Sequence, residues 1–230
     1  MPRLPRLCLP DIPLHIIQRG NNRHSCFNTD KDYAVYIDRL REYADQFQVA
    51  IHAYVLMTNH VHLLVTPTTE DGASQMMQSL GRYYVRYFNK RHRRSGTLWE
   101  GRFKASLVDS DLYFLTVSCY IEMNPVRAEM VAHPSDYIWS SYHFNGLMKP
   151  IKLITPHPLY LGLGATKELR AKHYSALFDS EITDFKIQEI REAINSTTVL
   201  GSDLFKRQLE LQTGLTLIPK PWGGDRRTKQ

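Results

Sequence analysis

The stretch VAIHAYVLMTNHVHLLVT, residues 49–66, predicts a β-hairpin at the centre of the fold. Two apolar runs flank Thr58 and Asn59, which form a tight turn. Side chains two residues apart in a strand share a face, so His60 and His62 are expected on the same side of the sheet. Their Cα atoms would lie about 6–7 Å apart. Two imidazoles at that spacing can bind one divalent metal.

Apolar periodicity places further elements around this β-hairpin. It predicts strands at 14–19 and 103–108, and helices at 30–48, from 71 or 74 to about 92, and from 111 to about 124. The order along the chain is β-α-β-β-α-β-α. Because the second and third strands are tightly joined, this order predicts an α+β fold, a ferredoxin-like antiparallel sheet with helices on one face.

The chain changes character after residue 149. Prolines at 150, 156 and 158 interrupt the pattern, and 165–178, 184–194 and 202–212 then predict short amphipathic helices. Residues 219–230 are polar, basic and rich in Gly and Pro, so we expect a flexible tail. The expected organisation is one domain over 1–149 and a helical extension over 150–230.

Composition narrows the class of protein. The 230 residues are 43% hydrophobic and 23% charged, as in a globular chain with one good core. No apolar run approaches about 18 residues, so no membrane span is expected. Three cysteines without Cys-x-x-Cys spacing argue against a disulfide framework or a structural zinc site and favour the cytoplasm.

Positive charge is concentrated in one segment. Residues 81–104 hold eight basic residues and one acid, a net charge of +7, against +6 for the whole chain. Such a local excess predicts a polyanionic partner. Arg82, Arg86, Lys90 and Arg93 recur at helical spacing and form a stripe. The alternative is a solvated outer face without a partner.

Further residues could contact nucleic acid. Trp99 could stack on unpaired bases, or it could belong to the core. The polar loop near residue 20 offers donors for phosphates or base edges, although a loop needs no such role. Besides the stripe, the candidate contacts are Arg19, Asn21, Asn22, Arg23, Arg94, Trp99, Arg102 and Lys104.

Tyr120 and Asn124 would share one face of a helix. Cutting a phosphodiester through a phosphotyrosine needs two components. One is a metal, bound here by two histidines and an amide oxygen, and the other is a tyrosine hydroxyl. Alternatively, Tyr120 packs the helix and Asn124 is the N-cap of a helix that begins at Pro125. Both interpretations can hold together. Glu122 would lie on another face and is not expected to bind the metal.

Five blocks of sequence resemble those of one known family. QRGNNR at 18–23, VLMTNHVHLL at 55–64, LWEGRF at 98–103, YIEMNPVRA at 120–128 and WSSY at 139–142 are similar to the bacterial REP-associated tyrosine transposases, which belong to the HUH single-tyrosine superfamily. The resemblance covers about residues 1–150. It implies the HUH nuclease fold, with His60 and His62 as metal ligands and Tyr120 as the nucleophile. Asn124 matches the third ligand position, where related transposases often have the longer Gln.

The resemblance also implies a reaction and partners. Mg²⁺ or Mn²⁺ would be the metal, and single-stranded or hairpin DNA of the REP type would be cut and rejoined through a 5′-phosphotyrosine. A bacterial, nucleoid-associated location and a monomer are expected, with a homodimer as the alternative. Two other functions stay open: a domesticated protein that binds DNA hairpins without cutting, and a phosphoesterase.

Overall fold

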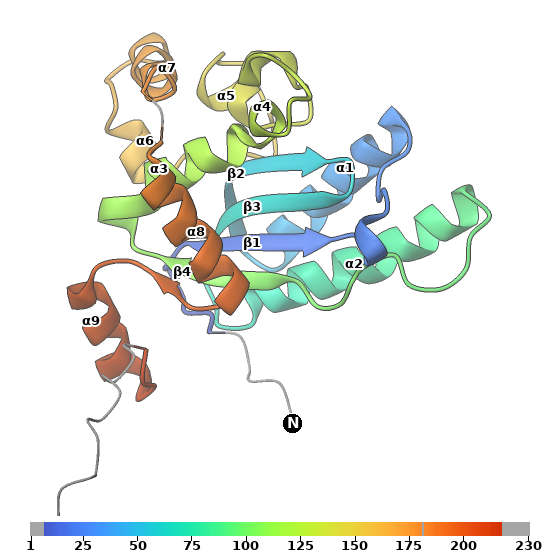
Figure 1. The fold of residues 1–230 in the computed structure, drawn as a ribbon, viewed down its shortest axis with the longest axis horizontal. Helices are drawn as coiled ribbons and strands as arrows, with labels where there is room; N and C mark the ends of the chain where they lie inside the picture. Colours follow the sequence, from blue (N-terminus) through green and yellow to red (C-terminus); the bar gives the residue numbers. More distant parts are fainter. Residues whose placement is uncertain (1–6, 181, 218–230) are drawn as a thin grey trace, which may run out of the picture.

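The computed structural model describes residues 7–180 and 182–217 and contains a five-stranded sheet in the order β2-β3-β1-β4-β5 (Figure 1). The strands are β1 (Leu14–Arg19), β2 (Val49–Met57), β3 (His60–Pro67), β4 (Lys104–Val108) and β5 (Val199–Leu200). The first four pair antiparallel in the ferredoxin-like order, which confirms the predicted α+β fold. β5 pairs parallel to β4, so the complete sheet is mixed.

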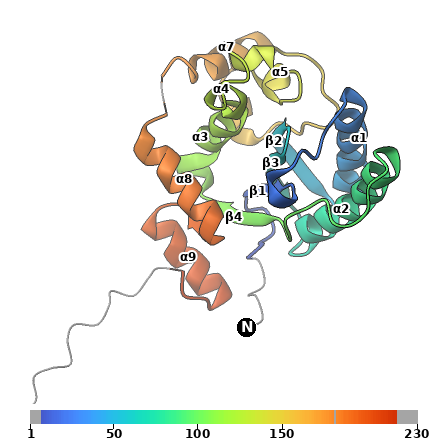
Figure 2. The same ribbon diagram turned by 45° about the vertical axis from the view of Figure 1, so that its right-hand side comes forward.

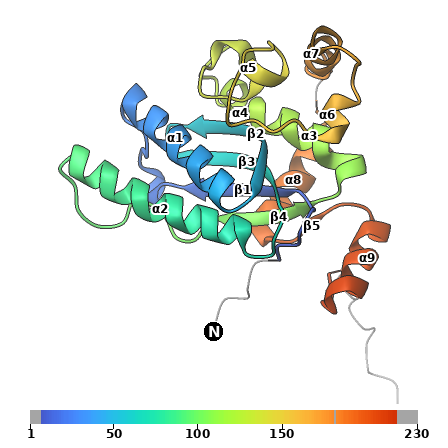
Figure 3. The ribbon, with the colours of Figure 1, turned by 180° about the vertical axis from the view of Figure 1, so that it is seen from behind.

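Helices cover both faces of the sheet. α1 (Asp30–Gln46) and α2 (Gly72–Arg91) pack on one face, whereas α3 (Ser110–Glu122) and α8 (Asp184–Ser196) pack on the other (Figures 2 and 3). The prediction that helices lie on one face only was therefore wrong. The reason is visible in β3, where Leu63 faces the α1–α2 core while Leu64 faces α3. Apolar residues on both sides of a strand require cover on both sides.

Several short helices complete the structure. They are η1 (Asn21–Arg23), α4 (Asn124–Arg127), η2 (Pro134–Asp136), α5 (Tyr142–Asn145), α6 (Pro158–Leu161), α7 (Lys167–Ala176) and α9 (Asp203–Thr213). Predicted helices in the C-terminal extension correspond to α7, α8 and α9. No helix in the described part of the chain is both long and apolar enough to cross a membrane.

The C-terminal extension packs directly onto the first 149 residues. It supplies β5 to the sheet, and Ile190 of α8 is buried in the core that α3 forms with β2 and β3. The boundary at residue 149 stays a prediction, and the predicted flexible tail, 219–230, lies outside the described residues.

A buried carboxylate joins α3 to this extension. Glu122 accepts hydrogen bonds from Ser141, from Asn145 at 2.8 Å and from the Tyr174 hydroxyl of α7 at 2.8 Å. Burial raises the pKa of Glu122 to about 7, although these hydrogen bonds act in the opposite direction. All of its described partners belong to this network.

Candidate active site

His60 and His62 lie on the face of β3 that α3 covers. In the register of the sheet, His60 is opposite Arg19 and His62 is opposite Ile17 of β1. The two imidazole centroids are 5.0 Å apart, with their planes at 69°. His60 Nδ1 bonds to Asn59 Oδ1 at 2.7 Å, and His62 Nδ1 bonds to His15 Nε2 at 2.9 Å. Both histidines therefore engage Nδ1 and leave Nε2 as the nitrogen for a metal.

Burial keeps these imidazoles neutral. It lowers the pKa of His60 to about 4, with Arg19 acting in the same direction, and the pKa of His15 to about 3. The pKa of His62 lies well below its usual value, chiefly because of burial. A neutral imidazole is the form that binds metal. Two neutral imidazoles with Nε2 available fit a divalent ion.

The remaining ligands would have to be of another type. Among the described residues, no group of three or more His, Cys, Asp or Glu side chains could hold a metal ion. An amide oxygen, water or a substrate phosphate must complete the coordination. Mixed nitrogen and oxygen sites of this kind accept Mn²⁺, and they accept Mg²⁺ when phosphate oxygens take part.

Tyr120 lies against the buried histidines. Its ring meets the ring of His62 edge-on at 6.0 Å and that of His15 at 5.9 Å. Helix α3 holds it there because its apolar face packs on β2 and β3. The side chain is only 4% exposed. Residues remote in sequence thus meet on one face of the sheet, as the proposed chemistry requires.

Arg127 also contacts Tyr120. Its guanidinium carbon is 4.2 Å from the centroid of the Tyr120 ring, and its Nη2 donates to the Tyr120 carbonyl at 2.6 Å. Burial lowers the pKa of Arg127, while Tyr120 acts in the opposite direction. The ring is therefore in contact with two imidazoles and a cation.

Asn124 occupies a turn between two helices. Its Nδ2 donates at 3.1 Å to the carbonyls of both Tyr120 and Ile121, so the amide caps the C-terminal end of α3. It is the first residue of α4, and Met123 takes the N-cap position that the alternative interpretation gave to Asn124. The described interactions include none between Asn124 and either histidine, and no hydrogen bond to its Oδ1.

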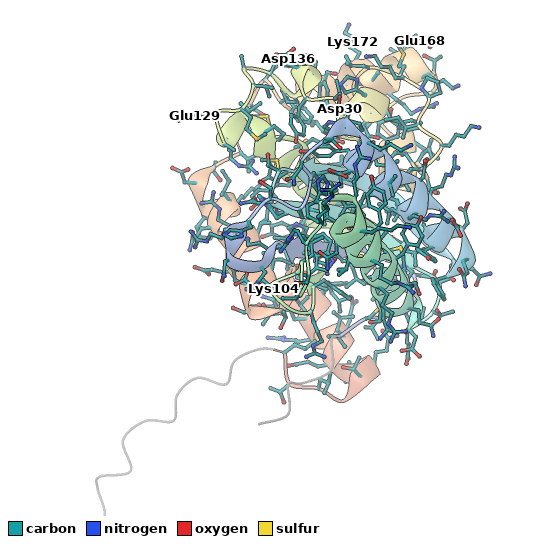
Figure 4. All side chains as sticks on the ribbon, turned by 90° about the vertical axis from the view of Figure 1, so that its right-hand side faces the viewer. Asp30, Lys104, Glu129, Asp136, Glu168 and Lys172 are labelled. Atoms are coloured by element: carbon teal, nitrogen blue, oxygen red, sulfur yellow. The ribbon has the colours of Figure 1, made fainter. Side chains whose placement is uncertain are left out.

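Polar residues gather where β1 ends. The loop after α2 runs beside this end, because Asn21 N donates to the Leu98 carbonyl at 2.8 Å and Glu100 N donates to the Arg19 carbonyl at 2.9 Å. Figure 4 views this edge of the molecule and labels Lys104. The candidate contacts Arg19, Asn22, Arg23, Arg102 and Lys104 are exposed here, and Asn21 is half-buried.

A groove of about 830 Å³ opens at the same edge. Arg19, Arg102 and Lys104 line one part of it, and 195–199 together with 215–217 of the extension line another. Lys104 Nζ donates to Asn195 Oδ1 at 3.1 Å across the groove. Arg19 lines the groove and is opposite His60 in the sheet, whereas His60, His62 and Tyr120 are not among the lining residues.

The other candidate contacts lie elsewhere. Arg82, Arg86 and Lys90 are exposed on α2, which covers the face of the sheet opposite Tyr120. The helix ends at Arg91, and Arg93 has a φ of 50°, so Arg93 and Arg94 lie in the following turn and not in the stripe. Trp99 is 7% exposed and packs on Tyr84 in the core, as its alternative interpretation stated.

Two residues of the site were missed from the sequence. His15 is one polar residue in a predicted strand, and nothing in the sequence gives the register that sets it beside His62. Arg127 was quoted only as part of a block of resemblance. A cation seven residues after the tyrosine becomes a neighbour only because the chain turns between α3 and α4.

Comparison with protein families decides where the chain belongs. The family model described as "Transposase IS200 like" matches residues 8–124, half of the chain, including His60, His62 and Tyr120. This chain belongs to the IS200-like transposase family. No curated protein matches this chain.

Solved structures show the fold of this IS200-like transposase. A REP-associated tyrosine transposase bound to a REP hairpin is similar over 68% of this chain and 93% of that one, with a TM-score of 0.53 and 18% identity. This likeness in fold, with the family match, confirms the resemblance seen in the sequence. A protein from Deinococcus radiodurans R1 named as a transposase is 24% identical over 52% of this chain and 95% of its own, with a TM-score of 0.38. A bacterial tRNA(His) guanylyltransferase-like protein in complex with GTP is 14% identical over 56% and 67%, with a TM-score of 0.34.

Proposed function

We propose that this IS200-like transposase cuts and rejoins single-stranded DNA beside a DNA hairpin, through a covalent bond to Tyr120. The observation that carries the proposal is the contact of the Tyr120 ring with His62, 6.0 Å between centroids, on one face of the sheet. The solved REP-associated transposase that shares this fold is bound to a REP hairpin, which supports the choice of DNA.

His60 and His62 would hold a divalent metal, Mg²⁺ or Mn²⁺, through Nε2. Asn124 would complete the set through Oδ1, the atom that its two hydrogen bonds to α3 leave available. When bound, the ion would offset the negative charge that otherwise repels a nucleophile from a phosphodiester. The hydrogen bonds at Nδ1 of each histidine orient the two rings for this purpose.

Tyr120 would supply the nucleophile. Its oxygen attacks phosphorus, the bond between phosphorus and the 3′ oxygen breaks, and the proton lost by the phenol is balanced by one gained at the leaving oxygen. A 5′-phosphotyrosine and a free 3′-OH result. One phosphate ester replaces another, so attack by a second 3′-OH rejoins the DNA without ATP. Arg127 holds the ring in place through the contacts described above.

The groove at the end of β1 is the proposed path of the single strand. Arg19, Arg102 and Lys104 would neutralise backbone phosphates there, and the amides of Asn21 and Asn22 would contact phosphates or base edges. Arg93 and Arg94, in the turn after α2, would contact only DNA that extends beyond this groove. Arg82, Arg86 and Lys90 would contribute only to DNA that continues round the edge to the α2 face. We leave Trp99 out because its ring is in the core.

We propose a monomer as the active species. Tyr120 and His62 of one chain are already in contact, so the site needs no helix from a second copy. A homodimer that exchanged α3 would have to break the packing of this helix on β2 and β3.

A binding protein that does not cut is the second candidate. The low exposure of Tyr120, 4%, favours it, because a scissile phosphate must reach the phenol. Cutting then requires a local opening of the segments over this ring.

The test is a covalent adduct with DNA. We expect Mn²⁺ or Mg²⁺ and a DNA hairpin with a single-stranded flank to give an SDS-resistant adduct that Tyr120→Phe abolishes. Tyr113→Phe is the matched control, since it is on the same helix and bonds to Glu189. An undiminished adduct in Tyr120→Phe would remove Tyr120 from its role, and tight binding without any adduct would establish the second candidate.

A further inference from the structure

His15 is a fully buried histidine near the start of β1 and touches two residues of the proposed site. Its Nε2 is 2.9 Å from His62 Nδ1, and its ring meets Tyr120 edge-on at 5.9 Å. The centroids of His15 and His62 are 5.2 Å apart, with the planes at 19°. This is about the largest separation of the centroids that a 2.9 Å distance between the two nitrogens allows, so both nitrogens lie on the line between the centroids. The rings therefore lie edge to edge and nearly coplanar, the geometry of a nitrogen-to-nitrogen hydrogen bond.

One proton lies between the two rings, and its position decides what His62 can do. If His62 Nδ1 donates, then His62 Nε2 carries a lone pair that can bind a metal. If His15 Nε2 donates instead, then His62 Nε2 carries the hydrogen and cannot be a ligand. The metal-competent arrangement thus needs His15 as an acceptor.

The neighbouring histidine is held in the same way. His60 Nδ1 lies 2.7 Å from Asn59 Oδ1, and an amide oxygen can only accept. His60 therefore donates from Nδ1 and presents a lone pair at Nε2. Each histidine of the pair thus has a partner at Nδ1 that can set its tautomer, as is usual around metal ligands.

A histidine at position 15 destabilises the fold. Its Nδ1 is buried and has no hydrogen-bond partner among the described residues. A buried polar atom without a partner costs about 1–3 kcal/mol. An apolar side chain at this place in β1 would avoid that cost, so packing does not account for a histidine here.

We propose that His15 is a positioning residue that accepts a hydrogen bond from His62 Nδ1 and so holds His62 Nε2 ready for the metal. This inference rests on the proposed role of His62 as a ligand. It assigns a function to a residue that itself neither binds the metal nor attacks the DNA.

The test is the affinity of the full chain for Mn²⁺ without DNA, measured by calorimetry on three variants. His15→Leu removes the acceptor, and we expect about 10- to 100-fold weaker binding. His15→Gln places an oxygen near the position of Nε2 and should restore most of the affinity. His52→Leu is the matched control: this buried histidine of β2 bonds to Thr66 and to the Thr155 carbonyl, and its loss should leave the affinity for Mn²⁺ unchanged.

The outcomes separate this inference from the proposed function. Binding of Mn²⁺ by His15→Leu as tightly as by the wild type overturns the role of His15 and leaves the metal site intact. Equal weakening in His15→Leu and His15→Gln also overturns it, because only packing would then explain the loss. A wild-type chain that binds no Mn²⁺ contradicts the metal site itself. If His15→Leu does not fold, His15→Gln is compared with the wild type instead. The proposal requires that His15→Gln retain most of the affinity for Mn²⁺, so loss of that affinity overturns it.

Discussion

At the scale of single residues, Arg127 connects the ring of Tyr120, the proposed nucleophile, to the backbone. Its guanidinium covers the Tyr120 ring and also donates to the carbonyl of the same residue. Arginine is suited to this double contact because its planar group can stack while its N–H groups donate in the plane. The orientation of the phenol thus depends on a side chain from the following helix, α4.

Loss of this contact should slow the chemical step. We expect Arg127→Leu to lower the single-turnover rate of adduct formation about 10-fold, since a partly desolvated cation–π contact contributes about 1–2 kcal/mol. Arg127→Lys should recover only part of the rate because an ammonium group cannot reproduce the planar stack. The affinity for the DNA hairpin, measured in parallel, should stay the same. A wild-type rate in Arg127→Leu would show that the stack does not orient the phenol.

The sequence shows which residues carry the chemistry more readily than it shows which residues lie beside them in the fold. His60, His62 and Tyr120 could be chosen because their side chains carry recognisable chemistry in recognisable blocks. His15 could not, since its meaning arises from a strand register that brings β1 beside β3. Trp99 shows the converse error: an aromatic ring between basic residues looks available for bases, yet it fills the core beside Tyr84.

At the scale of elements, Asp32 ties the start of α1 to the end of α2. Its carboxylate accepts from the Thr29 and Asn28 backbone amides at 2.9 and 3.0 Å, and it meets the His92 ring nitrogen at 3.0 Å. Tyr87 also donates to it, at 3.1 Å. Burial tends to raise the pKa of Asp32, but these hydrogen bonds outweigh it and leave the pKa below its usual value.

The stability from Asp32 should depend on pH. A carboxyl group whose pKa is lowered by folding stabilises the protein above its unfolded pKa, and this contribution disappears as pH falls through the lowered value. We expect Asp32→Asn to cost about 1–3 kcal/mol at pH 7, through the lost cap and charge-assisted hydrogen bonds. Urea unfolding at pH 7 and near pH 3 should show this difference shrinking in acid. A difference that grew toward pH 3 would contradict the assignment.

The bounds of a helix or strand could be predicted from the sequence where its local sequence pattern is strong. β1 and β2 have the bounds expected from their apolar runs. α3 stops two residues before Asn124, because the Asn124 side chain caps its last carbonyls, a detail that periodicity does not report. β5 has two residues and is formed by pairing with β4, so no local pattern could reveal it.

At the scale of the whole molecule, α3, which carries the proposed nucleophile, and the extension share one buried network. Glu122, two residues after Tyr120, receives donors from Ser141, Asn145 and Tyr174. A buried carboxyl without enough donors is costly. Ser141 and Asn145 therefore tie the α5 segment to α3, and Tyr174 ties α7 to it. The position of Tyr120 therefore depends in part on residues beyond 150.

Removal of the donor from α7 should destabilise the molecule. We expect Tyr174→Phe to lower the free energy of unfolding by about 1–3 kcal/mol, because it leaves a buried carboxyl oxygen without its partner. Tyr142→Phe is the control: it is equally buried, but its hydroxyl makes only a 3.4 Å contact with Ser175 and its loss should cost less. Equal losses in both variants, measured by denaturant unfolding, would count against the network.

The most direct test of the central claim is to locate the bond between protein and DNA. After adduct formation and nuclease digestion, trypsin should release residues 105–127 as one peptide, which holds both Tyr113 and Tyr120. We predict that fragmentation in the mass spectrometer places the nucleotide phosphate on Tyr120. A phosphate on Tyr113, or on any residue outside this peptide, would contradict the site described here.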